Sequence, residues 1–345
     1  MQVEDHDTGE NVQDQPDNPA RRRIFQAAAA AGIAAGLPAV ADAATPAHRA
    51  KAVKGSLDAK LKAHVKNVVV IYLENRSFNN LFADFPGLAS PMSALPPGAA
   101  AQKDRDGSVL PALPKVWGGM VPGQQNIGGK DYLIKEDHIS GLPNAPYALK
   151  DTEGKPLSEA IVTRDLWHRF YQNQMQINGG RNDGFAAWSD AGGMVMGYYG
   201  ETRKNLGLWQ IAREYTLCDH FFMAAFGGSY LNHQFLIAAR APQYPDVQNS
   251  PAKKLVAVLE DGPQGYRLAV APDSPKSALE GKPKFVSDGA ITPDGYTVNT
   301  MAPPYQPSWF KPAPGGDPLL ADPSHGEVLP PQSYKTIGDL MSEKG

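Results

Sequence analysis

The chain contains the apolar run NVVVIYL at residues 67–73, followed at once by the polar run ENRSF at residues 74–78. An unbroken series of β-branched and aromatic residues is typical of a strand buried on both faces, as in a parallel sheet covered by helices. Ligands of such α/β proteins bind outside the carboxyl ends of the strands. The run therefore predicts an α/β fold with a site beginning at Glu74. The alternative is an ordinary strand-to-loop transition with solvated polar side chains.

The composition is that of a soluble globular protein. Of 345 residues, 42% are hydrophobic and 20% are charged, and the formal net charge is −3. This balance lacks the basic excess of nucleic-acid binders, so we expect no nucleic-acid partner. The one cysteine, Cys218, cannot form an internal disulfide. Folding in a reducing compartment agrees with this cysteine usage.

The N-terminal residues have the pattern of an export signal. The run RRRIF at residues 21–25 precedes an alanine-rich segment, 27–41, and Ala-Asp-Ala at 41–43 offers a cleavage point. The apolar core is too short for a membrane anchor, and paired arginines followed by x-Phe resemble a twin-arginine signal. We therefore expect a leader at 1–43, a mature domain at 44–345, the twin-arginine export machinery as a partner, and a periplasmic or secreted location in a bacterium. An amphipathic or disordered leader is the alternative.

Periodicity and turn residues predict the remaining elements. Helices are expected at residues 165–177, 206–212, 230–240 and 336–344, and strands at 215–222, 254–259 and 296–300. Residues near 44–63 are expected to form an exposed helix or a linker. Residues 86–149 are rich in Pro, Gly and Ala with little periodicity. An irregular stretch of this length within a domain is usually a functional insertion.

Glu74 and Asn75 are candidate metal ligands. Carboxylate and amide oxygens suit a divalent cation such as Mg²⁺, Mn²⁺ or Ca²⁺, and Zn²⁺ is also compatible with them. Two ligands do not complete a coordination sphere, so the others must come from elsewhere in the fold.

Ser229 follows two glycines and begins an expected helix. The unpaired N–H groups of a helix N-terminus bind anions such as phosphate, and a serine there is a candidate nucleophile once a base or metal activates it. A simple N-cap serine is the alternative. His233, four residues on, would lie on the same helix face. His168 is a further candidate, although a lone histidine among aromatic residues is often structural.

Five sequence blocks occur in an order that resembles one bacterial phosphoesterase family. That family contains phosphatidylcholine-type phospholipase C and the respiratory-burst-inhibiting acid phosphatases. The resemblance extends over residues 65–345, and the blocks that carry it are ENRSF (74–78), DLWH (165–168), NGGRNDGF (178–185), TLCDHFF (216–222) and GGSYLNH (227–233).

The resemblance implies a fold, an activity and roles for particular residues. The fold would be an alkaline-phosphatase-like α/β/α sandwich carrying a Pro/Gly-rich insertion. Glu74 and Asn75 would bind the divalent metal, Ser229 would be the nucleophile, and His168 would bind the phosphate of a small phosphate-ester substrate. The run GGSYLNH resembles the acid phosphatase branch, whereas the phospholipase branch has GPTHPNR there, which favours phosphomonoesters. The alternatives are phospholipase C acting on the phosphodiester headgroups of membrane lipids and a noncatalytic envelope protein that binds phosphate.

The chain departs from the family pattern at its C-terminus. Family members continue beyond the helix at 336–344 with a His-His pair, an Asp-Asp pair that completes the metal site, and further strands. None of these follows Gly345 in this sequence. We therefore expect an incomplete sheet, in either the N-terminal part of a longer enzyme or a truncated, inactive relative.

Overall fold

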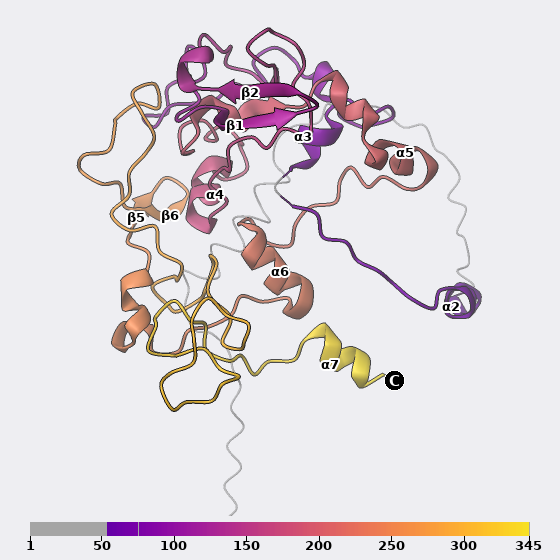
Figure 1. Ribbon diagram of the computed structural model, residues 1–345, viewed down its shortest axis with the longest axis vertical. Coiled ribbons are helices and arrows are strands. Elements are labelled where there is room, and N and C mark those ends of the chain that lie inside the picture. The colour runs from indigo at the N-terminus through magenta and orange to yellow at the C-terminus, as the bar shows by residue number, and fades with distance from the viewer. Residues whose placement is uncertain (1–53, 75, 345) are drawn as a thin grey trace, which may run out of the picture. The chain divides into compact units, whose positions relative to one another are not determined.

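The computed structural model describes residues 54–74 and 76–344. All of them belong to one compact unit, which extends from residue 45 to 345. The predicted leader at 1–43 lies outside the described residues and stays a prediction. The described part of the chain is a mixed α/β structure (Figure 1).

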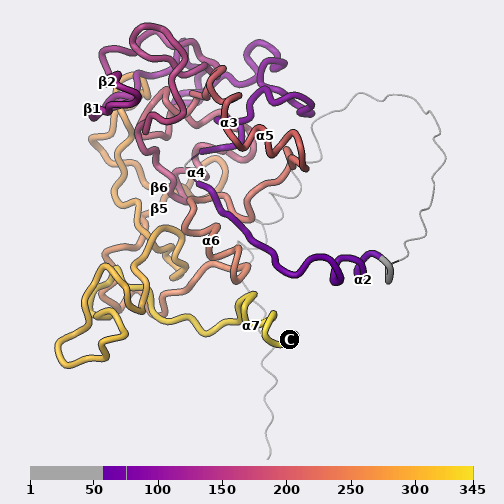
Figure 2. The backbone as a smooth tube through the Cα atoms, turned by 45° about the vertical axis from the view of Figure 1, so that its right-hand side comes forward, coloured from indigo at the N-terminus to yellow at the C-terminus, as the bar shows by residue number. Residues whose placement is uncertain are grey.

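The regular elements are short and are joined by long connections, which Figure 2 follows along the backbone. The helices are α2 (Lys54–His64), α3 (Phe78–Phe82), α4 (Phe170–Ile177), α5 (Gly207–Glu214), α6 (Ser229–Ala238) and α7 (Ile337–Ser342). The strands are β1 (Val121–Ile127), β2 (Lys130–Ile134), β3 (Tyr147–Ala148), β4 (Gly197–Tyr198), β5 (Leu259–Gly262) and β6 (Gly265–Leu268). β1–β2 and β5–β6 pair antiparallel, and β3–β4 pair parallel. No helix among the described residues is long and apolar enough to cross a membrane.

The predicted strands at 67–73 and 215–222 are absent. Neither segment has regular secondary structure or a partner strand within the described residues. Their side chains are exposed: Val69 is 81% exposed, Ile71 75% and Phe221 81%. Composition indicates what a segment can form, but a strand is stabilised by cross-strand pairs, which these segments lack here.

The Pro/Gly-rich stretch at 86–149 is less irregular than the sequence predicts, and its role as an insertion stays a prediction. It contains the β1–β2 hairpin, which turns through Gly128 and Gly129 in the left-handed region, with φ of 60° and 83°. Its apolar side chains also fill one of the main hydrophobic clusters. The members of that cluster from this stretch are Val116, Met120, Val121, Ile134 and Leu149, each at most 2% exposed.

Helix α4 begins five residues later than predicted. Arg169 is extended, with φ −117° and ψ 147°, and the Phe170 N–H donates to Asn299 Oδ1 at 2.9 Å. The Trp167 N–H donates to Asp190 Oδ1 at 3.0 Å. These hydrogen bonds to distant parts of the chain satisfy the N–H groups without a helix. Residues 165–169 therefore form an extended segment that leads into α4. The predicted end is confirmed, because Asn178 is a left-handed C-cap with φ 49°.

The predicted helices at 206–212, 230–240 and 336–344 are confirmed as α5, α6 and α7, with ends shifted by a few residues. α7 starts with a capping box in which Thr336 and Asp339 bond each other's backbone N–H groups.

The strands predicted at 254–259 and 296–300 do not form over those residues. A 3₁₀ turn covers Pro251–Leu255, β5 starts only at Leu259, and residues 296 and 297 make isolated bridges.

Candidate active site at the start of helix α6

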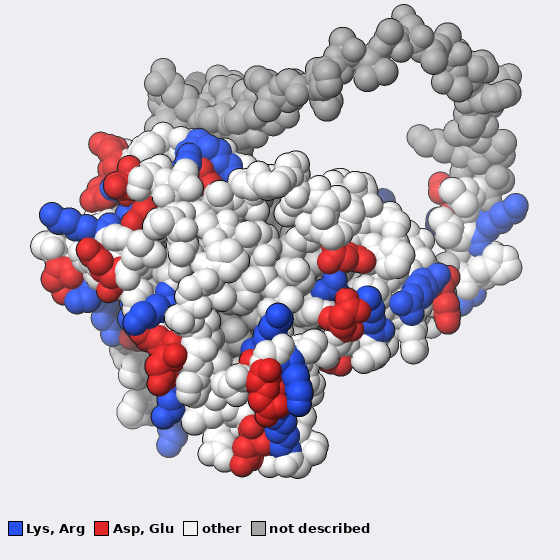
Figure 3. All heavy atoms as spheres, turned by 90° about the horizontal axis from the view of Figure 1, so that it is seen from above, with Lys and Arg blue, Asp and Glu red and all other residues white. Residues whose placement is uncertain are grey.

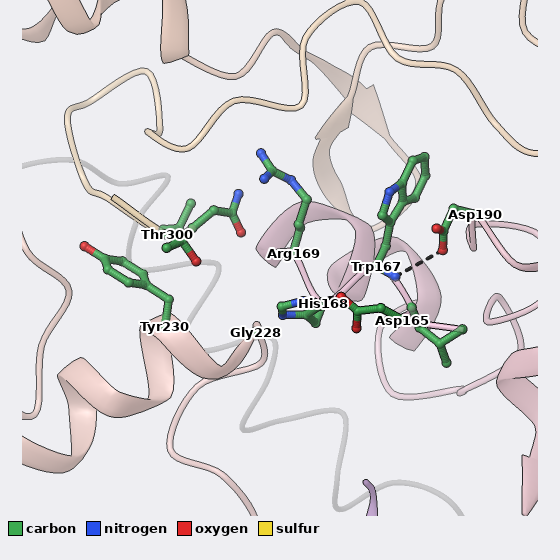
Figure 4. A pocket seen from close by; sticks show the side chains of 11 residues that line it. Asp165, Trp167, His168, Arg169, Asp190, Gly228, Tyr230 and Thr300 are labelled. Carbon is green, nitrogen blue, oxygen red and sulfur yellow. Dashed lines mark hydrogen bonds and ion pairs between the residues drawn. The ribbon is translucent and has the colours of Figure 1, made fainter. Parts of the chain in front are cut away.

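Helix α6 begins at Ser229, and the residue before it touches the His168 segment. Gly228 is the extended N-cap, with φ −69° and ψ 178°. A Cβ on Gly228 would lie 1.9 Å from the carbonyl oxygen of His168 and 3.5 Å from its Nδ1. Only a residue without a side chain allows this approach. The double glycine therefore brings the backbone just before Ser229 against His168, and Figure 4 shows Gly228 close to His168.

His168 is held in place through its backbone, while its ring is free to meet a ligand. The residue precedes α4 instead of lying within a helix, and its side chain is 52% exposed. Its Nε2 lies 3.7 Å from Asp165 Oδ2. The neighbouring Trp167 N–H is bound by Asp190, whose other oxygen lies 3.9 Å from Arg164 Nη2. An exposed imidazole ring on a backbone held by hydrogen bonds suits a residue that contacts substrate.

Glu74 reaches α6 one turn beyond Ser229. Its Oε2 lies 3.5 Å from His233 Nε2, and the ring of Tyr72 lies 4.2 Å from the ring of His233. Ser229 and His233 are four residues apart on one helix and so share a face. The Tyr72 hydroxyl donates to Met223 Sδ at 3.4 Å. Burial, and then the charge of Glu74, raise the pKa of Tyr72 and keep its hydroxyl neutral.

Three of the four predicted site residues lie on or next to the first two turns of α6 through neighbouring residues. Ser229 starts α6, His168 contacts the N-cap residue, and Glu74 lies beside the next turn. The fourth, Asn75, lies outside the described residues.

A metal ion needs more ligands than these residues provide. Glu74 and His233 offer two donor side chains near each other. Within residues 54–74 and 76–344, no group of three or more His, Cys, Asp or Glu side chains could hold one ion. The described residues alone therefore provide only part of a metal's ligand set, since protein metal sites usually have three or more protein ligands.

A cavity of about 360 Å³ opens beside the turn before Ser229. It lies between the His168 segment, the start of α6 and residues 298–300, as Figure 4 shows. Its lining includes Trp167, His168, Arg169, Tyr230, Asn299 and Thr300.

The charges of this cavity are largely neutralised by partners. The Arg169 guanidinium pairs with Asp288, with Nε 2.8 Å from Oδ2. The Tyr230 hydroxyl hydrogen-bonds Thr297 Oγ1 at 3.0 Å, and burial raises the pKa of Tyr230 to about 12. Apolar ring faces and satisfied polar groups suit an uncharged portion of a ligand.

Sequence reasoning missed several residues that build this site. The contact between Gly228 and His168 and the bond from Trp167 to Asp190 join distant parts of the chain, and the hydrogen bonds of Asn232 to the turn before α6 follow no pattern that the sequence reveals. The paired glycines before Ser229 were the one available signal of a close backbone approach.

The chain belongs to the phosphoesterase family. The model of that family, described as "Phosphoesterase family", matches residues 65–345. The match confirms the resemblance drawn from the five sequence blocks. No curated protein and no solved structure matches the chain.

Proposed function

We propose that this chain is an exported, metal-dependent acid phosphatase that hydrolyses phosphomonoesters through a phosphoserine on Ser229. Family membership supports hydrolysis of phosphate esters as the reaction class. The observation that carries the proposal is the position of Ser229 as the first residue of α6, between Gly228, which contacts His168, and His233, which contacts Glu74. The α/β/α sandwich implied by the resemblance is part of the same proposal.

The chain's own residues account for binding and orientation of the phosphate. The unpaired N–H groups of the first turn of α6 would stabilise the phosphate oxygens, and the exposed ring of His168 would donate a hydrogen bond to one of them. Ser229 Oγ would lose its proton and form a bond to phosphorus, while the bond to the alcohol oxygen breaks and the alcohol leaves with a proton. Water would then cleave the phosphoserine, which yields inorganic phosphate and restores the hydroxyl.

The cavity beside this turn would receive the alcohol portion of the substrate. Its lining includes the carboxylates of Asp165 and Asp190, and its Arg169 is paired with Asp288, which supports a leaving group without a strong negative charge. Glu74 and Asn75 remain the proposed metal ligands. A divalent cation, when bound, would supply positive charge that lowers the pKa of a serine hydroxyl.

The experiment measures hydrolysis of a chromogenic phosphomonoester by the native chain and by Ser229→Ala. The matched control is Ser250→Ala, which removes the capping serine of the 3₁₀ turn at Pro251–Leu255. We expect Ser229→Ala to lose turnover by at least ~10³-fold, Ser250→Ala to keep it, and a chelator to abolish it reversibly. Equal rates for native and Ser229→Ala would overturn the nucleophile assignment.

A second measurement separates the substrate classes. Turnover of a choline phosphodiester in vesicles is compared with turnover of the monoester. Faster diester hydrolysis would indicate a phospholipase C with a membrane lipid substrate. Saturable phosphate binding without turnover of either substrate would indicate a noncatalytic relative.

A further inference from the structure

Asn232 is a buried amide in the first turn of α6, with 5% of its surface exposed. Its Oδ1 accepts a hydrogen bond from the Ala225 N–H at 3.1 Å. Its Nδ2 lies 3.0, 3.3 and 3.2 Å from the carbonyl oxygens of Ala225, Gly227 and Gly228. The amide therefore bonds the chain on both sides of the turn that leads into Ser229.

This turn has little else to fix its conformation. Gly228 offers no side chain, and no side-chain hydrogen bond caps α6. Two consecutive glycines give the backbone more freedom than any other pair of residues. The other side chain that bonds the turn is Gln174 of α4, whose Nε2 donates to the Phe226 carbonyl at 2.6 Å. Besides the packing of Gly228 against His168 and this bond from Gln174, the contacts of Asn232 with three carbonyl oxygens hold the turn that directs Ser229.

We propose that Asn232 is a positioning residue, which holds residues 225–228 so that Ser229 is presented in one fixed orientation. The proposal rests on the proposed role of Ser229 as nucleophile. Asn232 touches the backbone of the turn and acts on substrate only through Ser229. An amide is required because it both accepts from one N–H and donates to carbonyl oxygens.

The test substitutes Asn232→Asp, which has the same size but an ionised carboxylate that cannot donate. Such a carboxylate would face three carbonyl oxygens at hydrogen-bonding distance, and repulsion would shift the turn. The matched control is Gln102→Glu. Gln102 is 1% exposed, donates to the carbonyls of Ala100 and Asn182, and accepts from the Phe185 N–H.

Three properties are measured for the native chain and both variants: steady-state kinetics on the monoester, inhibition by inorganic phosphate, and amide hydrogen exchange of the peptide that covers 225–233. We expect Asn232→Asp to lower kcat by about 10²-fold, the effect of displacing a reacting group by about 1 Å. The inhibition constant for phosphate and KM should change less than ~3-fold. Exchange should be faster in 225–233 for Asn232→Asp and unchanged there for Gln102→Glu.

Two results would overturn the proposal. One is a kcat of Asn232→Asp within about 3-fold of native, and the other is an equal loss of kcat in Gln102→Glu. If the native chain shows no turnover, the proposed function fails, while hydrogen exchange still decides whether Asn232 holds the turn. Faster exchange confined to 225–233 supports the holding role, and unchanged exchange excludes it.

Discussion

At the scale of single residues, the site depends on a contact that only glycine allows. The carbonyl oxygen of His168 occupies the space where a side chain on Gly228 would begin. This contact places an exposed imidazole beside the first residue of α6 without any direct bond between the two side chains. Gly228 and His168 therefore give separate tests of the arrangement.

Gly228→Ala is expected to reduce both stability and activity. The new Cβ would lie 1.9 Å from a backbone oxygen, so the two segments must separate. Such overpacking costs about 1–3 kcal/mol. Urea unfolding measures the loss, and turnover of a chromogenic monoester reports the displaced site. Gly207→Ala is the matched control, because Gly207 also begins a helix and its added Cβ would meet nothing within 4 Å. Similar losses in the two variants would contradict the contact argument.

His168→Ala is expected to lower kcat/KM by roughly 10²-fold, with stability unchanged within about 0.5 kcal/mol. The side chain is half exposed, so its removal leaves no cavity. Steady-state kinetics and thermal unfolding separate the two effects. His138→Ala is the control, since His138 is also a partly exposed histidine near an aspartate, 4.0 Å from Asp137. A stability loss without a change in kcat/KM would show that His168 is structural.

At the scale of elements, local patterns predicted helices better than strands. The amphipathic helix α5, helix α6 after its paired glycines and the capped helix α7 were predictable because their signals are local. The start of α4 was not, since Asn299 binds the Phe170 N–H, which a helix from residue 165 would have used. The run at 67–73 has the composition of a strand. A strand also needs a neighbouring strand to pair with, and the composition of the run does not identify one.

One ion pair ties the segment after α3 to the 3₁₀ turn Glu201–Asn205. Asp84 Oδ2 lies 2.9 Å from Nη2 of Arg203, whose side chain is 3% exposed, and Asp84 Oδ1 accepts from the Ser93 N–H at 2.7 Å. Burial alone would raise the pKa of Asp84. The bonds from Ser93 and the charge of Arg203 outweigh it and hold the pKa below its usual value.

The lowered pKa fixes the sign of a pH dependence. The unfolded chain binds the Asp84 proton more tightly, so the pair stabilises the fold above the ordinary carboxyl pKa of about 3.9 and loses this effect as pH falls through the lower folded pKa. Asp84→Asn should cost about 2 kcal/mol at pH 7, because it leaves a buried guanidinium without its charge partner. The difference from native should shrink toward low pH in urea unfolding. The exposed control Asp58→Asn should lie near native at every pH; a pH-independent deficit in Asp84→Asn would contradict the ion-pair argument.

At the scale of the whole molecule, the family could be predicted from sequence, whereas the sheet could not. Five ordered blocks identified the phosphoesterase family over the same residues that the family model matches. The site stays a prediction, supported by the contact of His168 with Gly228 and by the contact of Glu74 with His233, both at the start of α6. On the face shown in Figure 3, Lys and Arg are interspersed with Asp and Glu, and no large area carries charge of only one sign.

Export is the prediction that belongs to the whole chain. The paired arginines Arg22 and Arg23 precede Ile24 and Phe25, the spacing of the twin-arginine signal. The double substitution Arg22→Lys, Arg23→Lys should retain the protein in the cytoplasm of a bacterial host, as measured by fractionation. Arg21→Lys is the control, since it leaves the paired arginines intact. Undiminished export of the double variant would contradict the assignment.

The covalent intermediate tests the central claim most directly. The native chain is mixed with a phosphomonoester, quenched in acid within one turnover, digested and analysed by mass spectrometry. We predict a phosphate ester on the peptide that contains Ser229, absent from Ser229→Ala and from a sample quenched before substrate is added. Turnover of the substrate without any phosphate on Ser229 would contradict the account.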